Sequence, residues 1–194
     1  MLIAFEGLDQ SGKETQAKAL RDRLRAGGAK SRVVSFPDYG TTIGEEIARA
    51  LQGERDYDAE VMQLLYVANR YERKSDIERW QAAGLVVIFD RYVASSIAYG
   101  EAQGLESEWL VSLQRFLPWP DLTILLDVTP EIAVQRKMTG RDLYEGDIDL
   151  LSSARQSYLR QSEQPDWGKV DGQQAKDVVE EAIFDLVETR LGKT

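Results

Sequence analysis

Short apolar segments alternate with longer amphipathic segments along most of the chain. Several runs are almost continuously apolar and rich in β-branched residues, which is typical of strands buried on both faces of a parallel sheet. They are Leu2–Glu6, Arg32–Phe36, Leu85–Asp90 and Leu122–Asp127, with Asp166–Gly172 as a weaker fifth candidate. The pattern predicts an α/β fold, in which helices cover a layered parallel sheet and connect its strands through right-handed crossovers.

The segments between these runs have the periodicity and the end signals of helices. In the first of them, Ala17, Leu20 and Leu24 share one face, and a glycine pair at 27 and 28 ends the helix. Further helices are expected after Thr42, over Ala59–Gln81, after Ser107, from Pro130, over Ile148–Ser162 and over Ala175–Leu191. Because no linker or repeat interrupts the alternation, we expect residues 1–194 to form a single domain, with a charged, mobile lid at about 136–147.

Composition restricts the chemistry that the chain can perform. The sequence contains no cysteine and no histidine, which excludes disulfides, thiolate catalysis and the commonest general base. A metal would have to be a hard cation held by oxygen, which favours magnesium. The net charge of −9 disfavours nucleic acid and anionic membranes as partners, and we expect a cytoplasmic protein that acts on small molecules.

A glycine-rich stretch lies where the first predicted strand meets the first predicted helix. It reads FEGLDQSGKETQ from Phe5 to Gln16, close to the phosphate-binding pattern of glycine, four residues, glycine and lysine. Backbone N–H groups at a helix N-terminus bind phosphate, and a lysine adds a full positive charge. An ordinary strand-to-helix turn is the alternative. We expect the donor nucleotide to contact Gly7, Asp9, Gln10, Ser11, Gly12, Lys13, Glu14 and Thr15.

Glu14 departs from that pattern, because the residue after the lysine is usually a serine or threonine whose hydroxyl holds magnesium. A carboxylate can also ligate magnesium, Thr15 or a water molecule can replace it, and a degenerate loop is a further alternative. Asp90 ends a predicted strand, where it can orient magnesium through water, so the candidate metal ligands are Glu14, Thr15 and Asp90. Arg91 beside it can grip a phosphate with two hydrogen bonds, or form a structural ion pair with Asp90.

Further motifs follow in order: FPDYGTTIGEEI at 36–47, LLYVANRYE at 64–72, DRYVASSIAYG at 90–100, and LPWPDLTILLDVTPEIAVQRK ahead of RDLYE. Together with the loop, they resemble the thymidylate kinases over nearly the whole chain. The resemblance implies a three-layer P-loop kinase fold, with a five-stranded parallel sheet, helices on both faces and a short lid. It also implies a homodimer that uses magnesium and transfers the γ-phosphoryl group of ATP to dTMP.

The same resemblance implies roles in binding the acceptor. Phe36 would stack on the thymine, Arg70 would donate hydrogen bonds to a base carbonyl, and Tyr99 would pack where a ribose 2′-hydroxyl would sit. A core phenylalanine, a solvated arginine and simple helix packing are the structural alternatives. The other residues implied to bind the acceptor are Asp9, Tyr39, Arg91 and Ser96, the last at a position where some family members have asparagine.

The resemblance also implies that the lid supplies a positively charged side chain for catalysis. Some family members carry an arginine inside the phosphate loop, where this chain has Gln10. The resemblance therefore implies that Arg141, and after it Arg136, joins Lys13 and Arg91 in catalysis, the alternative being that these lid arginines are solvated loop charges. A phosphate acceptor is already ionised at neutral pH, so the reaction needs alignment and cations rather than a general base.

Three rival functions are compatible with parts of this pattern. A kinase with another pyrimidine acceptor would share most of the site. A non-catalytic nucleotide-binding protein would bind ATP without acceptor-dependent release of ADP, and Glu14 is the feature that favours it. A GTPase-like switch would need an Asn-Lys-x-Asp motif to read its base, and the sequence has none.

Overall fold

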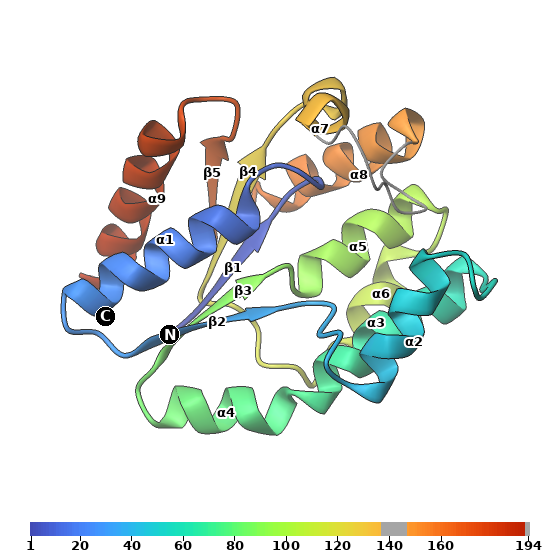
Figure 1. Cartoon of the computed structure of the whole chain (residues 1–194), viewed down its shortest axis with the longest axis horizontal. Helices are drawn as coiled ribbons and strands as arrows, with labels where there is room; N and C mark the ends of the chain where they lie inside the picture. Colours follow the sequence, from blue (N-terminus) through green and yellow to red (C-terminus); the bar gives the residue numbers. More distant parts are fainter. Residues whose placement is uncertain (137–146, 193–194) are drawn as a thin grey trace.

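Five parallel strands form one sheet in the computed structural model, which describes residues 1–136 and 147–192 (Figure 1). The strand order is β2-β3-β1-β4-β5, so β1 lies at the centre of the sheet. The α/β fold with a five-stranded parallel sheet is confirmed, including its weakest predicted strand. The strands are β1 (Leu2–Glu6), β2 (Ser31–Ser35), β3 (Val86–Asp90), β4 (Leu122–Asp127) and β5 (Trp167–Asp171).

Helices cover both faces of the sheet (Figure 1). On one face lie α1 (Lys13–Ala26) and α9 (Lys176–Leu191). On the other lie α4 (Lys74–Ala82), α5 (Val93–Ala102) and α8 (Ile148–Gln161), with α3 (Ala59–Glu72) and α6 (Ser107–Leu113) packed against α5. The remaining described helices are α2 (Thr42–Leu51), which packs on α3, and α7 (Pro130–Arg136), which contacts α8. Within the described ranges, no helix is long and apolar enough to cross a bilayer.

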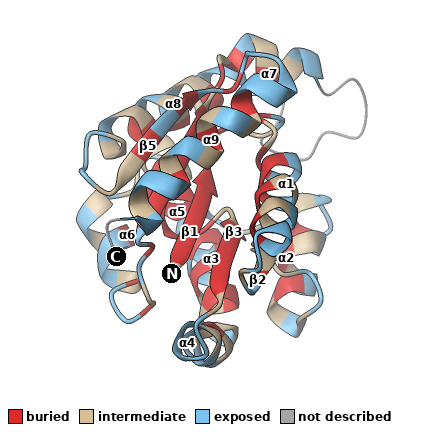
Figure 2. Cartoon of the chain, turned by 90° about the vertical axis from the view of Figure 1, so that its left-hand side faces the viewer, coloured by how far each residue is buried: buried red, intermediate tan, exposed pale blue. Residues whose placement is uncertain are grey.

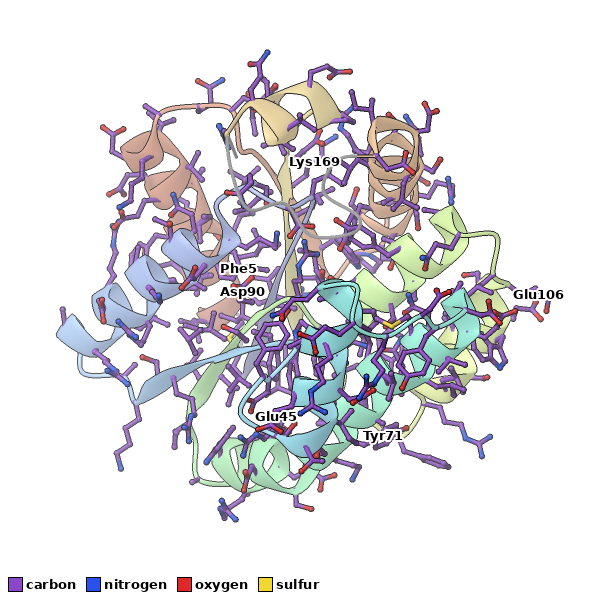
Figure 3. All side chains as sticks on the ribbon, turned by 45° about the vertical axis from the view of Figure 1, so that its right-hand side comes forward. Phe5, Glu45, Tyr71, Asp90, Glu106 and Lys169 are labelled. Carbon is purple, nitrogen blue, oxygen red and sulfur yellow. The ribbon has the colours of Figure 1, made fainter. Side chains whose placement is uncertain are left out.

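The apolar strands are buried on both sides, as their continuous hydrophobicity predicts. On β1, Ile3 and Phe5 join the core under α1 and α9, whereas Leu2 and Ala4 join the core that contains Ile77 of α4. Figure 2 shows β1 and β3 as buried at the centre of the molecule. Phe5 pairs with Asp90 of β3, and the two lie next to each other in Figure 3. The carboxyl ends of the two central strands are therefore held together by a close-packed core.

One predicted helix is wrong, and one helix is missed. Ala59–Gln81 forms two helices rather than one, because the chain changes direction at Arg73, with φ −95° and ψ −3°. Arg73 Nε also donates to Asp38 Oδ2 at 2.6 Å, which ties the break to the loop after β2. The sequence pattern does not predict α5, because Val93–Ala98 are all buried and an all-buried helix has no amphipathic period.

Candidate active site

The loop between β1 and α1 has an unusual backbone. Gly7, Gln10 and Gly12 have φ of 135°, 61° and 98°. A Cβ atom at Gly7 would lie 2.5 Å from the carbonyl oxygen of Leu126, so only glycine lets the loop pass this close to β4. Left-handed residues next to right-handed ones favour concave clusters of backbone N–H groups, and this loop leads directly into the N-terminus of α1. Such a loop suits an anion.

Lys13, the first residue of α1, is folded back into the loop. Its side chain is 5% exposed, and Nζ donates to the carbonyl oxygen of Leu8 at 2.8 Å. Burial and the neighbouring Arg91 lower the pKa of Lys13 to about 8, although Asp9 and Asp90 oppose them. At neutral pH the ammonium group therefore still carries its charge, next to the loop that can hold phosphates.

Arg91, the residue after β3, reaches back to the same loop. Its Nη2 donates to Asp9 Oδ1 at 2.6 Å, and its Nη1 lies 3.3 Å from the carbonyl oxygen of Gly7 and 3.2 Å from Ser95 Oγ. Arg91 therefore pairs with Asp9, not with Asp90. Its φ of 64° is left-handed, which is uncommon for a residue with a long side chain and costs roughly 1–2 kcal/mol. Strain of this kind concentrates at functional sites.

Asp9 is ionised and held from two sides. Burial alone would raise the pKa of Asp9, but the charges of Arg91 and Lys13 hold that pKa far below its usual range. Tyr99 OH donates to Asp9 Oδ2 at 3.0 Å. Burial and the Asp9 carboxylate raise the pKa of Tyr99, so the phenol keeps the proton that it donates. The Asp9 carboxylate thus links the loop after β1 to the end of β3 and to α5.

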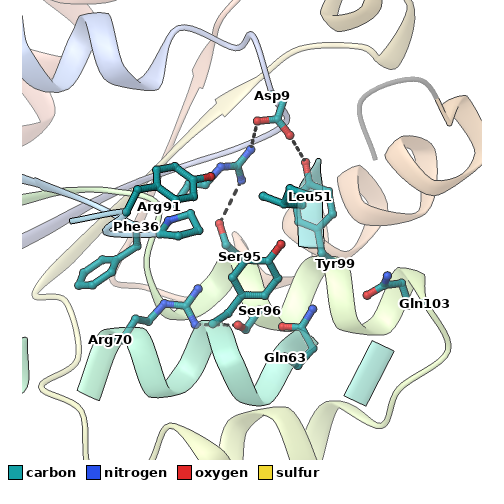
Figure 4. A pocket seen from close by; sticks show the side chains of 13 residues that line it. Asp9, Phe36, Leu51, Gln63, Arg70, Arg91, Ser95, Ser96, Tyr99 and Gln103 are labelled. Carbon is teal, nitrogen blue, oxygen red and sulfur yellow. Dashed lines mark hydrogen bonds and ion pairs between the residues drawn. The ribbon is translucent and has the colours of Figure 1, made fainter. Parts of the chain in front are cut away.

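A pocket opens beside this carboxylate, and Figure 4 shows the side chains around it. It brings together every residue that the sequence implied for acceptor binding: Asp9, Phe36, Tyr39, Arg70, Arg91, Ser96 and Tyr99. These residues come from the loop, the end of β2, α3, the end of β3 and α5. Because they are far apart in the sequence, their meeting in one pocket is a result of the fold.

Arg70 is a buried residue of the pocket rather than a solvated helix charge. Its Nη1 donates to Ser96 Oγ at 2.6 Å and to Gln114 Oε1 at 3.1 Å. Burial lowers the pKa of Arg70 to about 10, so its guanidinium group is still charged at pH 7. A buried, positively charged donor that is fixed from behind can orient a polar ligand.

Phe36 is a core residue that also borders the pocket. Its ring lies 5.7 Å from the ring of Tyr92 and 6.2 Å from that of Phe89, inside the core beside β3. It also forms part of the pocket wall. The core therefore holds a flat apolar surface at a fixed place in the pocket.

Other pocket residues were missed by sequence reasoning. Gln63 and Tyr66 precede Arg70 on α3 by seven and four residues, a spacing that puts all three on one helix face. That spacing is visible in the sequence once Arg70 is taken as a pocket residue, so it could have found them. The full set of missed residues is Pro37, Leu51, Gln63, Tyr66, Ser95 and Gln103.

The candidate metal ligands all offer oxygen, but they are not placed alike. Glu14 has a side chain that is 65% exposed and forms an ion pair with Lys18 one turn further along α1. Thr15 is exposed as well. Asp90 is only partly exposed, and it lies close enough to Lys13 to raise the pKa of that lysine. Oxygen is the ligand type that magnesium prefers, so the chemistry of these side chains fits the ion, but the described residues contain no group of three or more acidic side chains placed to hold a metal by themselves.

Arg136, at the end of α7, links the phosphate loop to the segment that follows β5. Its Nη1 donates to the carbonyl oxygen of Gln10 at 3.2 Å, and its Nη2 to that of Gly172, just after β5, at 2.9 Å. Arg141, the other lid arginine of the sequence analysis, lies outside the described residues. Of the two, only Arg136 can therefore be placed beside the phosphate loop.

The structure combines a parallel sheet, a phosphate loop at the carboxyl ends of its strands, and an adjoining pocket that contains Arg70 and Arg91. This combination is typical of the P-loop nucleotide kinases, the class of enzyme to which this protein belongs. Comparison with known proteins narrows the class. The sequence profile of the thymidylate kinases matches residues 5–183, and the chain belongs to the thymidylate kinase family.

Individual relatives agree over nearly the full length. The chain is 37% identical to a thymidylate kinase of Schizosaccharomyces pombe, with 96% of this chain and 90% of that protein covered. It is 36% identical to one of Caenorhabditis elegans, with 97% and 90% covered. The solved structure of a thymidylate kinase from Candida albicans superposes with a TM-score of 0.86 at 32% identity, covering 97% of this chain and 91% of that one.

Proposed function

We propose that this enzyme transfers the γ-phosphoryl group of ATP to dTMP, which gives ADP and dTDP. The observation that carries the proposal is the position of Arg91, which contacts the phosphate loop at Gly7 and Asp9 and also lines the acceptor pocket. A cation between two anion sites can hold two phosphate groups together and offset their repulsion. The names of the relatives, all thymidylate kinases, support this choice of acceptor.

On the donor side, Lys13 and the backbone N–H groups of the loop would hold the phosphates of ATP. A magnesium ion bound with the nucleotide would offset charge on those phosphates, and Asp90 and Thr15 are the ligands we favour. Glu14 would first have to leave its ion pair with Lys18. Arg136 already contacts the loop, and we propose that it and Arg141 supply the cations that meet the charge developing during transfer.

On the acceptor side, Phe36 would stack on the base and Arg70 would donate to a base carbonyl, with Ser96 and Tyr39 as further contacts. Tyr99, held by its hydrogen bond to Asp9, would occupy the space that a ribose 2′-hydroxyl needs, which favours deoxynucleotides. The attacking phosphate oxygen is ionised at neutral pH. These side chains therefore only have to align the acceptor and exclude water.

We also propose that residues 1–194 act as one domain and that two copies form a homodimer. Apolar side chains are exposed on two helices that contact each other, α3 and α6, and on the segment that follows α6. They are Val61, Leu64, Val111, Phe116 and Trp119. Burying such a surface against a second copy would remove it from water.

The proposal is tested by coupled release of ADP across a panel of acceptors: dTMP, dUMP, UMP, CMP and AMP. We expect dTMP to be preferred, with UMP at least ~10-fold less efficient because of Tyr99. Arg91→Ala should lower the dTMP-dependent rate by roughly 10²-fold or more. The C. albicans relative is described as having broad substrate specificity, so some turnover of dUMP is compatible with the proposal. ATP binding without acceptor-dependent ADP release would instead support a non-catalytic protein.

A further inference from the structure

The amide of Gln63 is buried in the acceptor pocket with unused hydrogen-bonding capacity. The residue is 1% exposed, and its side chain lines the pocket in Figure 4. Within the part of the chain that the structure describes, its Oε1 has no hydrogen-bond partner. Leaving a buried amide oxygen unpaired costs roughly 1–3 kcal/mol, so such an atom in a pocket calls for a ligand.

The fold places this amide beside the groups that orient the base in the proposed function. Gln63 and Arg70 share one face of α3, and Ser96 comes from α5, which packs against α3. In Figure 4, Arg70, Ser96 and Gln63 lie along the same side of the pocket. Arg70 and Gln63 therefore border the same side of the pocket.

The neighbouring polar groups can donate hydrogen bonds but have little capacity left to accept them. An arginine is only a donor. Ser96 Oγ accepts from Arg70 Nη1 at 2.6 Å, which leaves the hydroxyl proton of Ser96 to donate elsewhere. Gln114 Oε1 accepts from the same guanidinium group. Gln63 Oε1 is thus the buried acceptor that is still available among the described pocket residues.

A thymine or uracil ring presents a carbonyl oxygen, an N–H group and a second carbonyl oxygen along one edge. The donors of Arg70 and Ser96 suit the carbonyl oxygens, and the N–H group needs an acceptor. We propose that Gln63 is a specificity-determining residue whose Oε1 accepts a hydrogen bond from the ring N3–H group of the acceptor base. A cytosine ring has no proton on that nitrogen. This inference rests on the proposed function, because it concerns the same pocket.

The amide of Gln63 is expected to strengthen binding of the acceptor without stabilising the free protein. In the free protein the unpaired Oε1 is a cost, so Gln63→Met, which keeps the length of the side chain and removes the amide, does not lower the melting temperature. In the complex the same change removes one hydrogen bond. The expected result is a rise in KM for dTMP of about 3- to 10-fold, with kcat within about 2-fold of the wild type.

The experiment measures ADP release with dTMP for the wild type and for Gln63→Met, together with thermal unfolding. N3-methylated dTMP, which lacks the N3 proton, is tested as an inhibitor that competes with dTMP. We expect its inhibition constant to be the same or lower in the variant, because no hydrogen bond to Gln63 is lost. Gln81→Met is the matched control, since Gln81 is an exposed glutamine of α4, and it should behave as the wild type throughout.

An unchanged KM for dTMP in Gln63→Met overturns the assignment, and so does an equal loss of binding for dTMP and its N3-methyl derivative. A lower melting temperature, or a variant that fails to fold, also overturns it, because the amide would then have a structural role. In all of these cases, dTMP-dependent ADP release by the wild type leaves the proposed function standing. A wild type that releases no ADP with dTMP removes the proposed function itself.

Discussion

Among single residues, Lys13 shows most clearly how burial controls charge in the loop. Its pKa is lowered from the ordinary lysine value of 10.5 to about 8, mainly by desolvation. Between these two pH values the unfolded chain binds more protons at this site than the folded protein does. Folding stability therefore gains from Lys13 as the pH rises through that window, while the positive charge that a phosphate needs is lost.

We expect ATP to bind more weakly as the pH rises above about 8. We also expect Lys13 to take up a fraction of a proton when ATP binds at such a pH, because the negative phosphates favour the charged form of the lysine. Calorimetric titration with ATP in buffers of different ionisation enthalpy measures both quantities. Lys13→Arg keeps its charge at these pH values, so whatever affinity it has should not depend on pH in this window. An ATP affinity that stays constant up to about pH 10 in the wild type would contradict the assignment.

Sequence motifs alone singled out Lys13 and Arg91, and the structure places both side chains against the loop after β1. The sequence did not locate Gln63 or Tyr66, because a glutamine or tyrosine on an amphipathic helix has no distinctive signal until one knows which face borders the pocket. Nor could it orient Glu14. The direction of that side chain depends on Lys18, an ordinary surface residue one turn away.

Among elements, the link between β1 and α5 depends on a single carboxylate. The N-cap residue of α5, Tyr92, provides no side-chain cap. Instead Glu6, the last residue of β1, accepts hydrogen bonds from the backbone N–H groups of Tyr92 at 2.9 Å and Ser95 at 3.3 Å. Its other oxygen accepts from Ser95 Oγ at 2.6 Å and from Tyr158 OH of α8 at 3.2 Å. Glu6, on the strand next to β3, thus caps the N-terminus of α5 and also holds α8 through Tyr158.

Glu6→Ala should lower the free energy of unfolding by about 3 kcal/mol or more, because several buried donors lose their acceptor at once. Glu6→Gln should cost less, since its amide oxygen still accepts. Urea unfolding monitored by circular dichroism gives these values. Glu54→Ala, at an exposed loop position, is the control and should stay within about 0.5 kcal/mol of the wild type. A small loss in Glu6→Ala would mean that the capping bonds contribute little.

The pattern of apolar residues predicted most elements, because strands and amphipathic helices have different periods. It failed where the period was absent or uninformative. The helix α5 is buried on nearly all sides, and the break at Arg73 shifts the chain without disturbing the spacing of apolar residues. Contacts with other elements decide both features, so a local pattern does not contain them.

For the whole molecule, periodicity predicted a parallel α/β sheet but not the order of its strands. The order β2-β3-β1-β4-β5 brings the ends of β1 and β3 side by side, and this adjacency lets Arg91 reach the loop after β1. The family resemblance supplied the expected fold in advance. The homodimer remains a proposal, and it can be tested by a substitution on the surface proposed to form the interface.

Leu64, on α3, is 46% exposed within the proposed dimer surface. Leu64→Glu should shift the protein toward the monomer, because a dimer would then have to bury two new charges. Analytical ultracentrifugation over a range of concentrations measures the shift. Val178→Glu is the matched control: Val178 is 52% exposed on α9, across the sheet from α3, so its replacement should leave the dimer intact. A wild type that sediments as a monomer throughout would rule out the dimer.

The close passage of Gly7 beside the carbonyl oxygen of Leu126 has a consequence for how the enzyme can fail. At this point the shape of the loop after β1 depends on the distance between β1 and β4 rather than on the side chains of the loop itself. A substitution deep in the sheet that spreads those strands would also deform the loop. ATP affinity would then suffer from damage that touches no nucleotide-binding side chain.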